Sequence, residues 1–490
     1  MTVQAYLYYQ LKWFDPSLPD STISSQAGVL HASFMAAQFV TAMIWGRLAD
    51  SARFGRKFVL LVGLVGTSLS CVGFGFATSF WQALLFRTLG GMTNGNIGVM
   101  RTMISEIIRE KKYQSRAFLL LPMTFNIGII VGPILGGILS DPAGSYPDWF
   151  GKVDFFVKFP YATPNIVSSL FLISAAVAVW LGLEETLDTV RDSGKEDFGS
   201  KLGHKLAALL KGRTSGYSAV PSADVVELVA EDDPVPPTRK SGKRFTQRLE
   251  FKRIFTRNVV LTFGAQFLMT FHVGTFNSLW FVFLSTPVYD PASSKHTTSL
   301  PFRFTGGLGL PPQSVGFAMA ILGVVGISMQ LFLYPQVSAR LGTIRSWRYF
   351  LLCFPVAYFL VPYLSVVPSS DPPPSQKTGP LIWLTLLSIL LVHVLGRTFA
   401  LPAQVILINN CSPHPSVLGT IHGLGQSVSS LARTIGPMVG GFVYGVGLNS
   451  GFVGLVWWAL SGIGICACLA SLLVREGDGH EIWLEGDEED

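Results

Sequence analysis

Charged residues are scarce in this sequence. Asp, Glu, Lys and Arg together make up 13% of its 490 residues, whereas a soluble globular domain carries about 25%. Hydrophobic residues reach 49%, and they gather in uncharged runs of roughly twenty residues, the length that crosses a bilayer as a helix. The sequence is therefore predicted to be an all-α polytopic membrane protein.

Residues with the spacing of a catalytic or metal site are also missing. The five cysteines show no disulfide or zinc-binding spacing, and four of them lie in apolar runs, where we expect them to pack as small apolar residues. No nucleophile–base–acid set, phosphate-binding loop or HExxH motif occurs. We therefore predict no catalytic residue, no cofactor and no metal site, and an enzyme is disfavoured.

The net charge of +6 does not indicate nucleic-acid binding. The basic residues lie in loops between apolar runs, and they concentrate in every second loop. This alternation is typical of the loops that stay in the cytoplasm. We expect a lipid bilayer to surround the protein, and we expect it to bind no nucleic acid.

The apolar runs predict eleven complete spans and an N-terminal stub. Residues 5–14 are apolar but too short to cross a bilayer, so we expect them to be the outer end of a first helix that is truncated in this sequence. The complete spans are predicted at 26–45, 58–77, 80–106, 117–139, 161–183, 259–284, 313–334, 349–367, 381–401, 417–445 and 451–474.

Composition divides the chain into four parts. An N-terminal helix bundle is predicted over 1–186, and a hydrophilic segment rich in Ser, Gly and Pro over 187–252 is typical of a flexible cytoplasmic linker. A C-terminal bundle follows over 253–475, and an acidic tail over 476–490 is predicted to be disordered and cytoplasmic. Within the linker, residues 201–213 have leucines and basic residues at helical spacing, which fits a membrane-surface helix and a solvated helix equally well.

The two predicted bundles share short sequence repeats. Gly132-Pro133-Ile-Leu-Gly136-Gly137 recurs as Gly436-Pro437-Met-Val-Gly440-Gly441, and Arg53-Phe54-Gly55 recurs as Arg340-Leu341-Gly342. Both repeats follow the same order on either side of the linker. Such internal repeats are typical of transporters built from duplicated bundles.

Three motifs resemble the major facilitator superfamily, specifically its drug:proton antiporter group and the zinc-induced-facilitator-like branch. The resemblance extends over about residues 5–475 without the linker. In this sequence, the loop between the second and third helices contains two additional residues, Ser51 and Ala52, that the family pattern lacks. The matching residues are Gly46, Asp50, Arg53, Gly55, Arg56 and Lys57 in that loop, Gly128, Gly132, Pro133, Gly136 and Gly137 in the fifth helix, and Gly419, Gly423, Gln426, Ser427, Ser430, Arg433, Gly436 and Pro437 in the eleventh.

The resemblance implies a major facilitator fold of two pseudo-symmetric six-helix bundles. It further implies a monomeric secondary transporter that exports a small solute in exchange for protons by alternating access, in the vacuolar or plasma membrane. The alternative is a non-transporting, degenerate or receptor-like paralogue, because the family's first helix commonly carries an Arg and a Glu that this sequence lacks. A drug, an organic anion, a metal chelate and potassium all remain open as substrates.

The loop at 46–57 is expected to close the cytoplasmic side. Asp50 can accept hydrogen bonds from a helix N-terminus or pair with an arginine, and the resemblance assigns this role of a latch to Asp50, Arg53 and Arg56. For Arg47 and Lys57 the favoured interpretation is that their charge only orients the loop toward the cytoplasm.

Charged and polar residues within the predicted spans are candidates for the substrate cavity. A charge inside a span costs about 3 kcal/mol unless it is paired or faces water, so we expect Arg87 to face the bundle interior, although it could also reach the outer interface. A histidine can relay protons, but it can also serve only in packing. The candidate cavity and proton-relay residues are Arg87, Arg101, Asn126, Gln266, His393, Arg397, His422, Gln426 and Arg433.

Glycines spaced by four residues predict a bare ridge on one helix face. With a proline between them, they favour close helix packing and a bend. The residues of this motif are Gly128, Gly132, Pro133, Gly136 and Gly137, and their repeat is Gly436, Pro437, Gly440 and Gly441.

Overall fold

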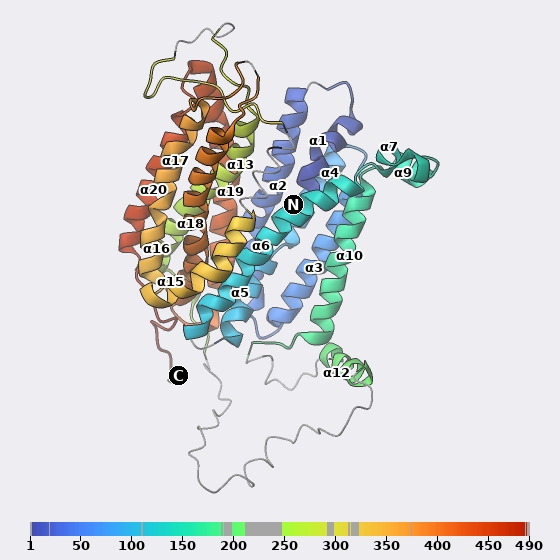
Figure 1. The fold of residues 1–490 in the computed structure, drawn as a ribbon. Coiled ribbons are helices and arrows are strands. Elements are labelled where there is room, and N and C mark those ends of the chain that lie inside the picture. The colour runs from blue at the N-terminus through green and yellow to red at the C-terminus, as the bar shows by residue number, and fades with distance from the viewer. Residues whose placement is uncertain are drawn as a thin grey trace.

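The structure is a computed structural model. It describes residues 2–18, 20–108, 111–187, 190, 198–210, 247–291, 298–311, 314, 323–373, 375–485 and 487. The described helices form two groups that stand side by side, and helix α12 lies at one end of the molecule together with the C-terminal tail (Figure 1). We call this end the linker side.

The first helix group consists of seven long helices and three short ones. Helix α2 packs against α4, and α3 packs against α10. The short helices α7 (Pro142–Ser145), α8 (Pro147–Phe150) and α9 (Asp154–Lys158) project from the group at the end opposite the linker side (Figure 1). The long helices are α1 (Thr2–Phe14), α2 (Asp20–Ala49), α3 (Gly55–Gly75), α4 (Phe80–Thr93), α5 (Asn96–Ile107), α6 (Lys111–Leu139) and α10 (Ala162–Gly182).

The second helix group surrounds a large apolar core. Trp280, Phe354 and Trp457 are fully buried in it, and they come from three different helices. The elements of this group are α13 (Arg257–Ser285), η2 (Met329–Leu333), α15 (Tyr334–Leu341), α16 (Thr343–Leu351), α17 (Cys353–Leu360), η3 (Val361–Ser365), α18 (Pro380–Asn410), η4 (Pro415–Val417), α19 (Leu418–Ser450) and α20 (Leu455–Leu473).

Seven helical stretches in the described residues are long and apolar enough to span a membrane. They agree with the low charge content, because each window contains at most two charged residues. Residues 313 and 315–322 of the predicted span at 313–334 lie outside the described residues. The seven stretches are Gln26–Ala49, Gly55–Gly75, Ala162–Gly182, Arg257–Ser285, Thr343–Ser365, Pro380–Asn410 and Leu455–Leu473.

The predicted span at 80–106 is not one continuous helix, because the structure divides it into α4 and α5. The helix ends at Thr93 and restarts at Asn96. Gly95 lies so close to Trp45 of α2 that a Cβ atom would collide with the indole. Gln38 Nε2 donates to the freed carbonyl of Asn94 at 2.8 Å, so a neighbouring helix satisfies the broken backbone.

The predicted helix in the linker is present but begins three residues earlier than expected. Helix α12 (Phe198–Leu210) packs against the end of α10, where Gly203 lies against the Leu181 carbonyl. Residues 211–213 of the predicted helix lie outside the described residues. Contact with α10 explains the helix better than solvation alone, since Ser200 in its first turn is buried.

The described residues of the tail, which is predicted to be disordered, lie against the second helix group. Gly479 N donates to Asn410 O at 3.0 Å, and Ile482 N donates to Pro413 O at 2.9 Å. Ile482 and Leu484 pack against a small apolar cluster on the linker side of the second group. These two apolar side chains within an acidic stretch give the tail a surface to bury.

Candidate functional site

Helices α2 and α19 face each other over much of their length and join the two groups. The facing residues recur every three or four positions on each helix, as one face of an α-helix requires. On α2 they are Gln38, Ala42 and Gly46, with His31 two turns further along, and on α19 they are Gly419, Gly423, Gln426, Ser430 and Arg433.

At the linker side, Asp50 of the first group caps the first turn of α19 in the second group. Its Oδ1 accepts from Gly419 N at 2.9 Å and from Arg56 Nη1 at 2.6 Å. Its Oδ2 accepts from Thr420 N and from Thr420 Oγ1, both at 2.5 Å. The first backbone N–H groups of a helix have no partner within the helix, and a carboxylate there also meets the positive end of the helix dipole. Asp50 therefore holds the two groups together.

Arg56 connects this contact to two further acidic and polar side chains. Its guanidinium is fully buried, and its Nη2 donates to Glu106 Oε1 at 2.8 Å. Thr186 Oγ1 donates to Glu106 Oε2 at 2.5 Å. The charge of Arg56 is thus shared between Asp50 and Glu106, which allows a buried cation to be tolerated.

A second acid, Glu185, caps the start of α3 within the first group. Its Oε1 accepts from Arg56 N and its Oε2 from Lys57 N, both at 3.0 Å. Gly55 has φ +80°, and a Cβ atom there would collide with the Glu185 carboxylate. The sequence pattern did not identify Glu185 or Thr186. The available signal was that Glu185 is an acidic residue at the end of an apolar run.

Two basic residues of the loop are placed differently from the prediction. Lys57 is buried, and its Nζ donates to Trp180 O at 2.8 Å and to Ser200 Oγ at 3.2 Å, so it connects α3 to α10 and α12 rather than only orienting the loop. Arg53 is exposed and lies over the Phe54 ring, with its Cζ 5.8 Å from the centroid. The turn formed by Ser51 and Ala52 separates Arg53 from Asp50, so Arg53 does not join the predicted latch.

Glycines allow α2 and α19 to cross at close range above Asp50. A Cβ atom on Gly46 would collide with the Gly419 carbonyl, and it would lie 3.0 Å from Gly423 Cα. A Cβ atom on Gly423 would lie 2.7 Å from Ala42 O. Any larger side chain at these positions forces the helices apart.

In the middle of the contact, Gln38 bridges the two groups through hydrogen bonds. Its Oε1 accepts from Gln426 Nε2 at 3.1 Å and from Ser430 Oγ at 2.8 Å, while its Nε2 donates to Asn94 O. The structure thus gives the predicted Gln426 a partner in the other group. Sequence reasoning missed Gln38, whose only signal was a large amide within an uncharged run.

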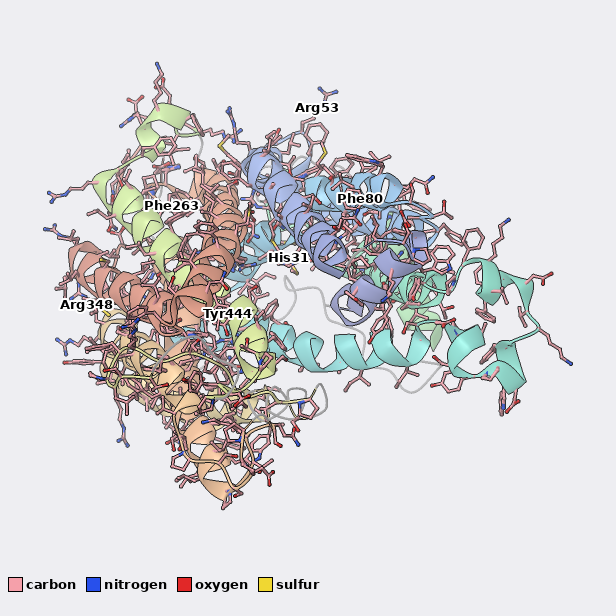
Figure 2. All side chains as sticks on the ribbon, turned by 90° about the horizontal axis from the view of Figure 1, so that it is seen from above. His31, Arg53, Phe80, Phe263, Arg348 and Tyr444 are labelled. Carbon is pink, nitrogen blue, oxygen red and sulfur yellow. The ribbon has the colours of Figure 1, made fainter. Side chains whose placement is uncertain are left out.

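Beyond Gln38, three arginines and a histidine approach the contact from both groups. Arg87 Cζ lies 5.0 Å from the Phe34 ring centroid, and the positive charges of Arg87 and Arg433 both act on His31. Arg101 lies close enough to Arg433 for repulsion, and its Nε and Nη1 atoms have no hydrogen-bond partner. Figure 2, seen from the end opposite the linker side, shows His31 between helices of the two groups.

No carboxylate pairs with these arginines in the part of the chain that the structure describes. We use the name arginine cluster for Arg87, Arg101 and Arg433, of which two act on His31 and two act on each other.

The remaining candidate residues lie deeper within the second group. His393 stacks on Phe276 with a centroid distance of 3.8 Å, and neither of its ring nitrogens has a partner, which favours packing over proton relay. Arg397 Nη1 donates to Asn277 Oδ1 at 3.3 Å. His422 Nε2 lies 3.2 Å from Asn409 Oδ1, and Gln266 Nε2 donates to Ser429 Oγ at 2.5 Å. The side chain of the last candidate, Asn126, lies outside the described residues.

The two glycine motifs do not pack alike. In α19, Cβ atoms on Gly436 and Gly440 would collide with Thr275 of α13, as the predicted ridge requires. Gly128, Gly137 and Gly441 have nothing within 4 Å of such an atom, so close packing is wrong at these three positions. Both helices continue through the motif and its proline, while the surroundings of Gly132, Pro133 and Gly136 are not described.

Comparison with known proteins places this geometry in a family context. The family model of the Major Facilitator Superfamily matches residues 7–389. The major facilitator superfamily multidrug transporter mfsB of Aspergillus fumigatus is 34% identical over 98% of this chain and 81% of its own length. Zinc induced facilitator 1 of Arabidopsis thaliana is 27% identical over 90% of this chain and 79% of its own length.

Solved structures agree with the arrangement of the helices. The human organic anion transporter MFSD10 has a TM-score of 0.62 at 17% identity, covering 96% of this chain and 94% of its own. The proton:xylose symporter XylE has a TM-score of 0.61 at 13% identity, covering 98% and 93%. At these identities the likeness concerns the fold alone.

Proposed function

This chain belongs to the Major Facilitator Superfamily and is a multi-pass membrane transporter rather than an enzyme, and from this premise we propose that it exports a small anionic solute in exchange for protons. Export would proceed by alternating access, in which the two helix groups rock about a site between α2 and α19. A single chain performs the cycle as a monomer, in the vacuolar or plasma membrane.

The observation that carries this proposal is the cap that Asp50 forms on α19. A carboxylate of one group bound to backbone N–H groups of the other can close one side reversibly, because hydrogen bonds can break and re-form as the groups move. The abundance of Lys and Arg in the loops of the linker side supports a cytoplasmic position for the linker and the tail. The described state is then closed toward the cytoplasm.

The arginine cluster supports an anionic solute. A cation within a membrane span is costly unless it is paired or hydrated, and within the described residues these three arginines have no acidic partner. A bound anion would supply the missing charge. His31 lies beside Arg87 and Arg433, so protonation of its ring would change the local charge when the solute leaves.

Purified full-length protein in liposomes that enclose a pH-sensitive dye tests this proposal. A panel of matched aromatic carboxylates, neutral amides and amines is added outside, and the internal pH is recorded. We expect some carboxylates to move protons, whereas Arg101→Gln reduces the rate at least about tenfold, the effect of about 1.4 kcal/mol. Arg345→Gln is the matched control, since Arg345 is exposed on α16.

Two results would overturn parts of the proposal. Solute uptake without any proton movement would remove the coupling to protons. Proton movement with the amines alone, unaffected by Arg101→Gln, would remove the anionic solute.

A further inference from the structure

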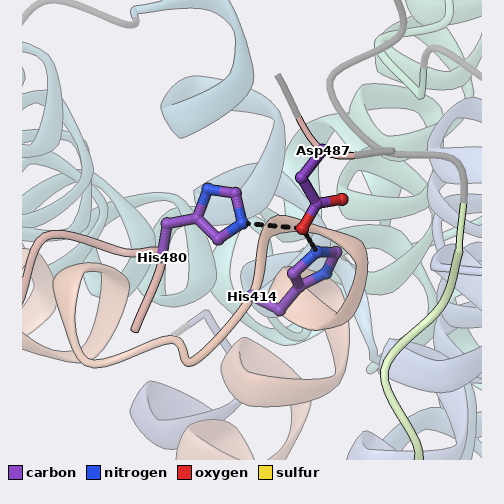
Figure 3. Close-up of side chains that lie close together, drawn as sticks. All are labelled: His414, His480 and Asp487. Carbon is purple, nitrogen blue, oxygen red and sulfur yellow. Dashed lines mark hydrogen bonds and ion pairs between the residues drawn. The ribbon is translucent and has the colours of Figure 1, made fainter. Parts of the chain in front are cut away.

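The folded-back tail brings three metal-binding side chains together on the linker side. His414 lies in the loop between α18 and α19, while His480 and Asp487 lie in the tail (Figure 3). One ligand atom from each of the three lies within 4.8 Å of the other two. This cluster is separate from the contact between α2 and α19, and it shares no side chain with the arginine cluster.

The two distances from Asp487 to the histidines are close to those around a tetrahedral metal ion. Asp487 Oδ2 lies 3.0 Å from His414 Nε2 and 3.1 Å from His480 Nε2. Two ligand atoms at about 2.0 to 2.1 Å from a tetrahedral ion stand roughly 3.3 Å apart. Replacing the shared proton of each hydrogen bond with one ion therefore requires only small movements.

The surroundings hold the ligands in position. His414 Nδ1 lies 2.6 Å from Ser416 Oγ, which also accepts from Leu249 N at 3.1 Å. Nδ1 also accepts from Ser416 N at 3.2 Å, so the ring proton lies on Nε2, toward Asp487. A metal at Nε2 would require this proton to leave, and Ser416 Oγ could accept from Nδ1 if the proton moved there; outer hydrogen bonds of this kind are usual for metal-binding histidines. The His480 ring stacks on Trp483 at a centroid distance of 4.0 Å.

We propose that His414, His480 and Asp487 bind a divalent transition-metal ion of the zinc type. Two neutral imidazoles and one carboxylate suit zinc, with a water molecule in the fourth position, and they suit magnesium or calcium poorly because those ions prefer oxygen ligands. The metal fastens the tail to the loop that leads into α19.

At this position, a bound metal could affect the transport cycle through the loop that leads into α19. Gly419, which donates to Asp50, follows His414 by five residues along the chain. The tail also contacts Asn410 and Pro413 in the same loop. A bound metal therefore stabilises the loop from which the cap on α19 begins.

Binding of zinc to the purified full-length protein in detergent tests the site. We expect titration calorimetry with Zn²⁺ to show one saturable site that His480→Ala and Asp487→Asn each weaken at least about tenfold. His204→Ala is the matched control, because His204 is exposed on α12. His480 is partly exposed, so its removal leaves the helix core intact.

Trypsin supplies a second readout that does not depend on calorimetry. Cleavage after the exposed Arg475 releases the tail, and we expect Zn²⁺ to slow this cleavage in the wild type and in His204→Ala but not in His480→Ala. Equal zinc affinity in wild type, His480→Ala and Asp487→Asn would overturn the proposal. Tail cleavage that zinc leaves unchanged in the wild type would overturn the claim that the metal fastens the tail.

Discussion

Asp50 uses both of its carboxylate oxygens and accepts four hydrogen bonds. Three of these come from Gly419 and Thr420 in the other helix group, and the fourth comes from Arg56. A neutral amide offers only one oxygen as an acceptor, and its NH₂ group would face the donors that Oδ1 or Oδ2 now satisfies. The charge of Asp50 also balances part of the fully buried Arg56.

We expect Asp50→Asn to reduce transport at least about tenfold, because the cap on α19 loses charge-assisted hydrogen bonds worth about 1.5 to 3 kcal/mol each. Glu106 still pairs with Arg56, so we expect the variant to fold. Initial rates of solute-driven proton movement in liposomes measure the effect. Asp148→Asn, which changes an exposed acid in α8, serves as the control; a rate equal to wild type in Asp50→Asn would mean that the loop only orients the protein in the membrane.

At the residue scale, the sequence predicts which side chains form important hydrogen bonds better than it predicts the residues to which they bond. An acid between basic residues after an apolar run indicates a helix cap, but the helix that Asp50 caps begins 368 positions later, and spacing cannot show that. Of the two arginines expected to join Asp50, Arg56 does so and Arg53 does not. Arg53 and Arg56 are equivalent by pattern, and only the turn at Ser51 decides which one points inward.

At the scale of single elements, the α2–α19 crossing depends on glycine. Gly46 and Gly423 meet backbone to backbone, so the two helices approach more closely than side chains would allow. The glycine pattern in α19 was visible in the sequence. The pattern does not reveal which glycines meet another helix, since Gly436 packs tightly while Gly441 faces open space.

We expect Gly423→Leu to keep the linker side from closing and to abolish transport. An overpacked contact costs about 1 to 3 kcal/mol, so the unfolding temperature should fall as well. Gly441→Leu is the matched control on the same helix, and it should transport and unfold like the wild type because its new side chain meets nothing within 4 Å. Transport rate and thermal unfolding followed on the same purified samples distinguish a blocked contact from a misfolded protein. Wild-type transport in Gly423→Leu would show that close approach of the helices is not required.

The break between α4 and α5 also lies at the element scale. Nothing in the run at 80–106 except Asn94-Gly95 indicates an interruption, and single glycines and asparagines occur within many helices. The deciding contacts come from Trp45 and Gln38 of α2. Tertiary contacts of this kind are not encoded in local periodicity.

At the scale of the whole molecule, the apolar runs predict a polytopic helical membrane protein, and the resemblance to the major facilitator superfamily implies its two-bundle fold. Long uncharged runs, a duplicated glycine motif and a hydrophilic middle segment predict two helix groups and a linker. The folded tail could not be predicted in this way, because its anchoring residues Ile482 and Leu484 are too few to stand out in an acidic stretch.

The alternation of basic loops makes a prediction about orientation. We expect an epitope inserted in the linker and one fused after the C-terminus to face the cytoplasm, and one inserted at Asp148 to face the opposite side. Antibody access to intact cells, to cells with only the plasma membrane permeabilised, and after full solubilisation measures this for either membrane. Linker and tail epitopes on opposite sides of the membrane would contradict the proposed topology.

The two acidic caps differ in whether a movement of the helix groups would break their hydrogen bonds. Glu185 caps α3 within one helix group, so its hydrogen bonds persist throughout a rocking motion. Asp50 caps α19 across the groups, so in the proposed cycle its hydrogen bonds would all have to break before the linker side opens. Each 1.4 kcal/mol of strength in that cap would then lengthen the lifetime of the state that is closed at the linker side about tenfold. The number of donors that meet Asp50 thus determines how long the carrier dwells in that state, independently of how tightly it binds its solute.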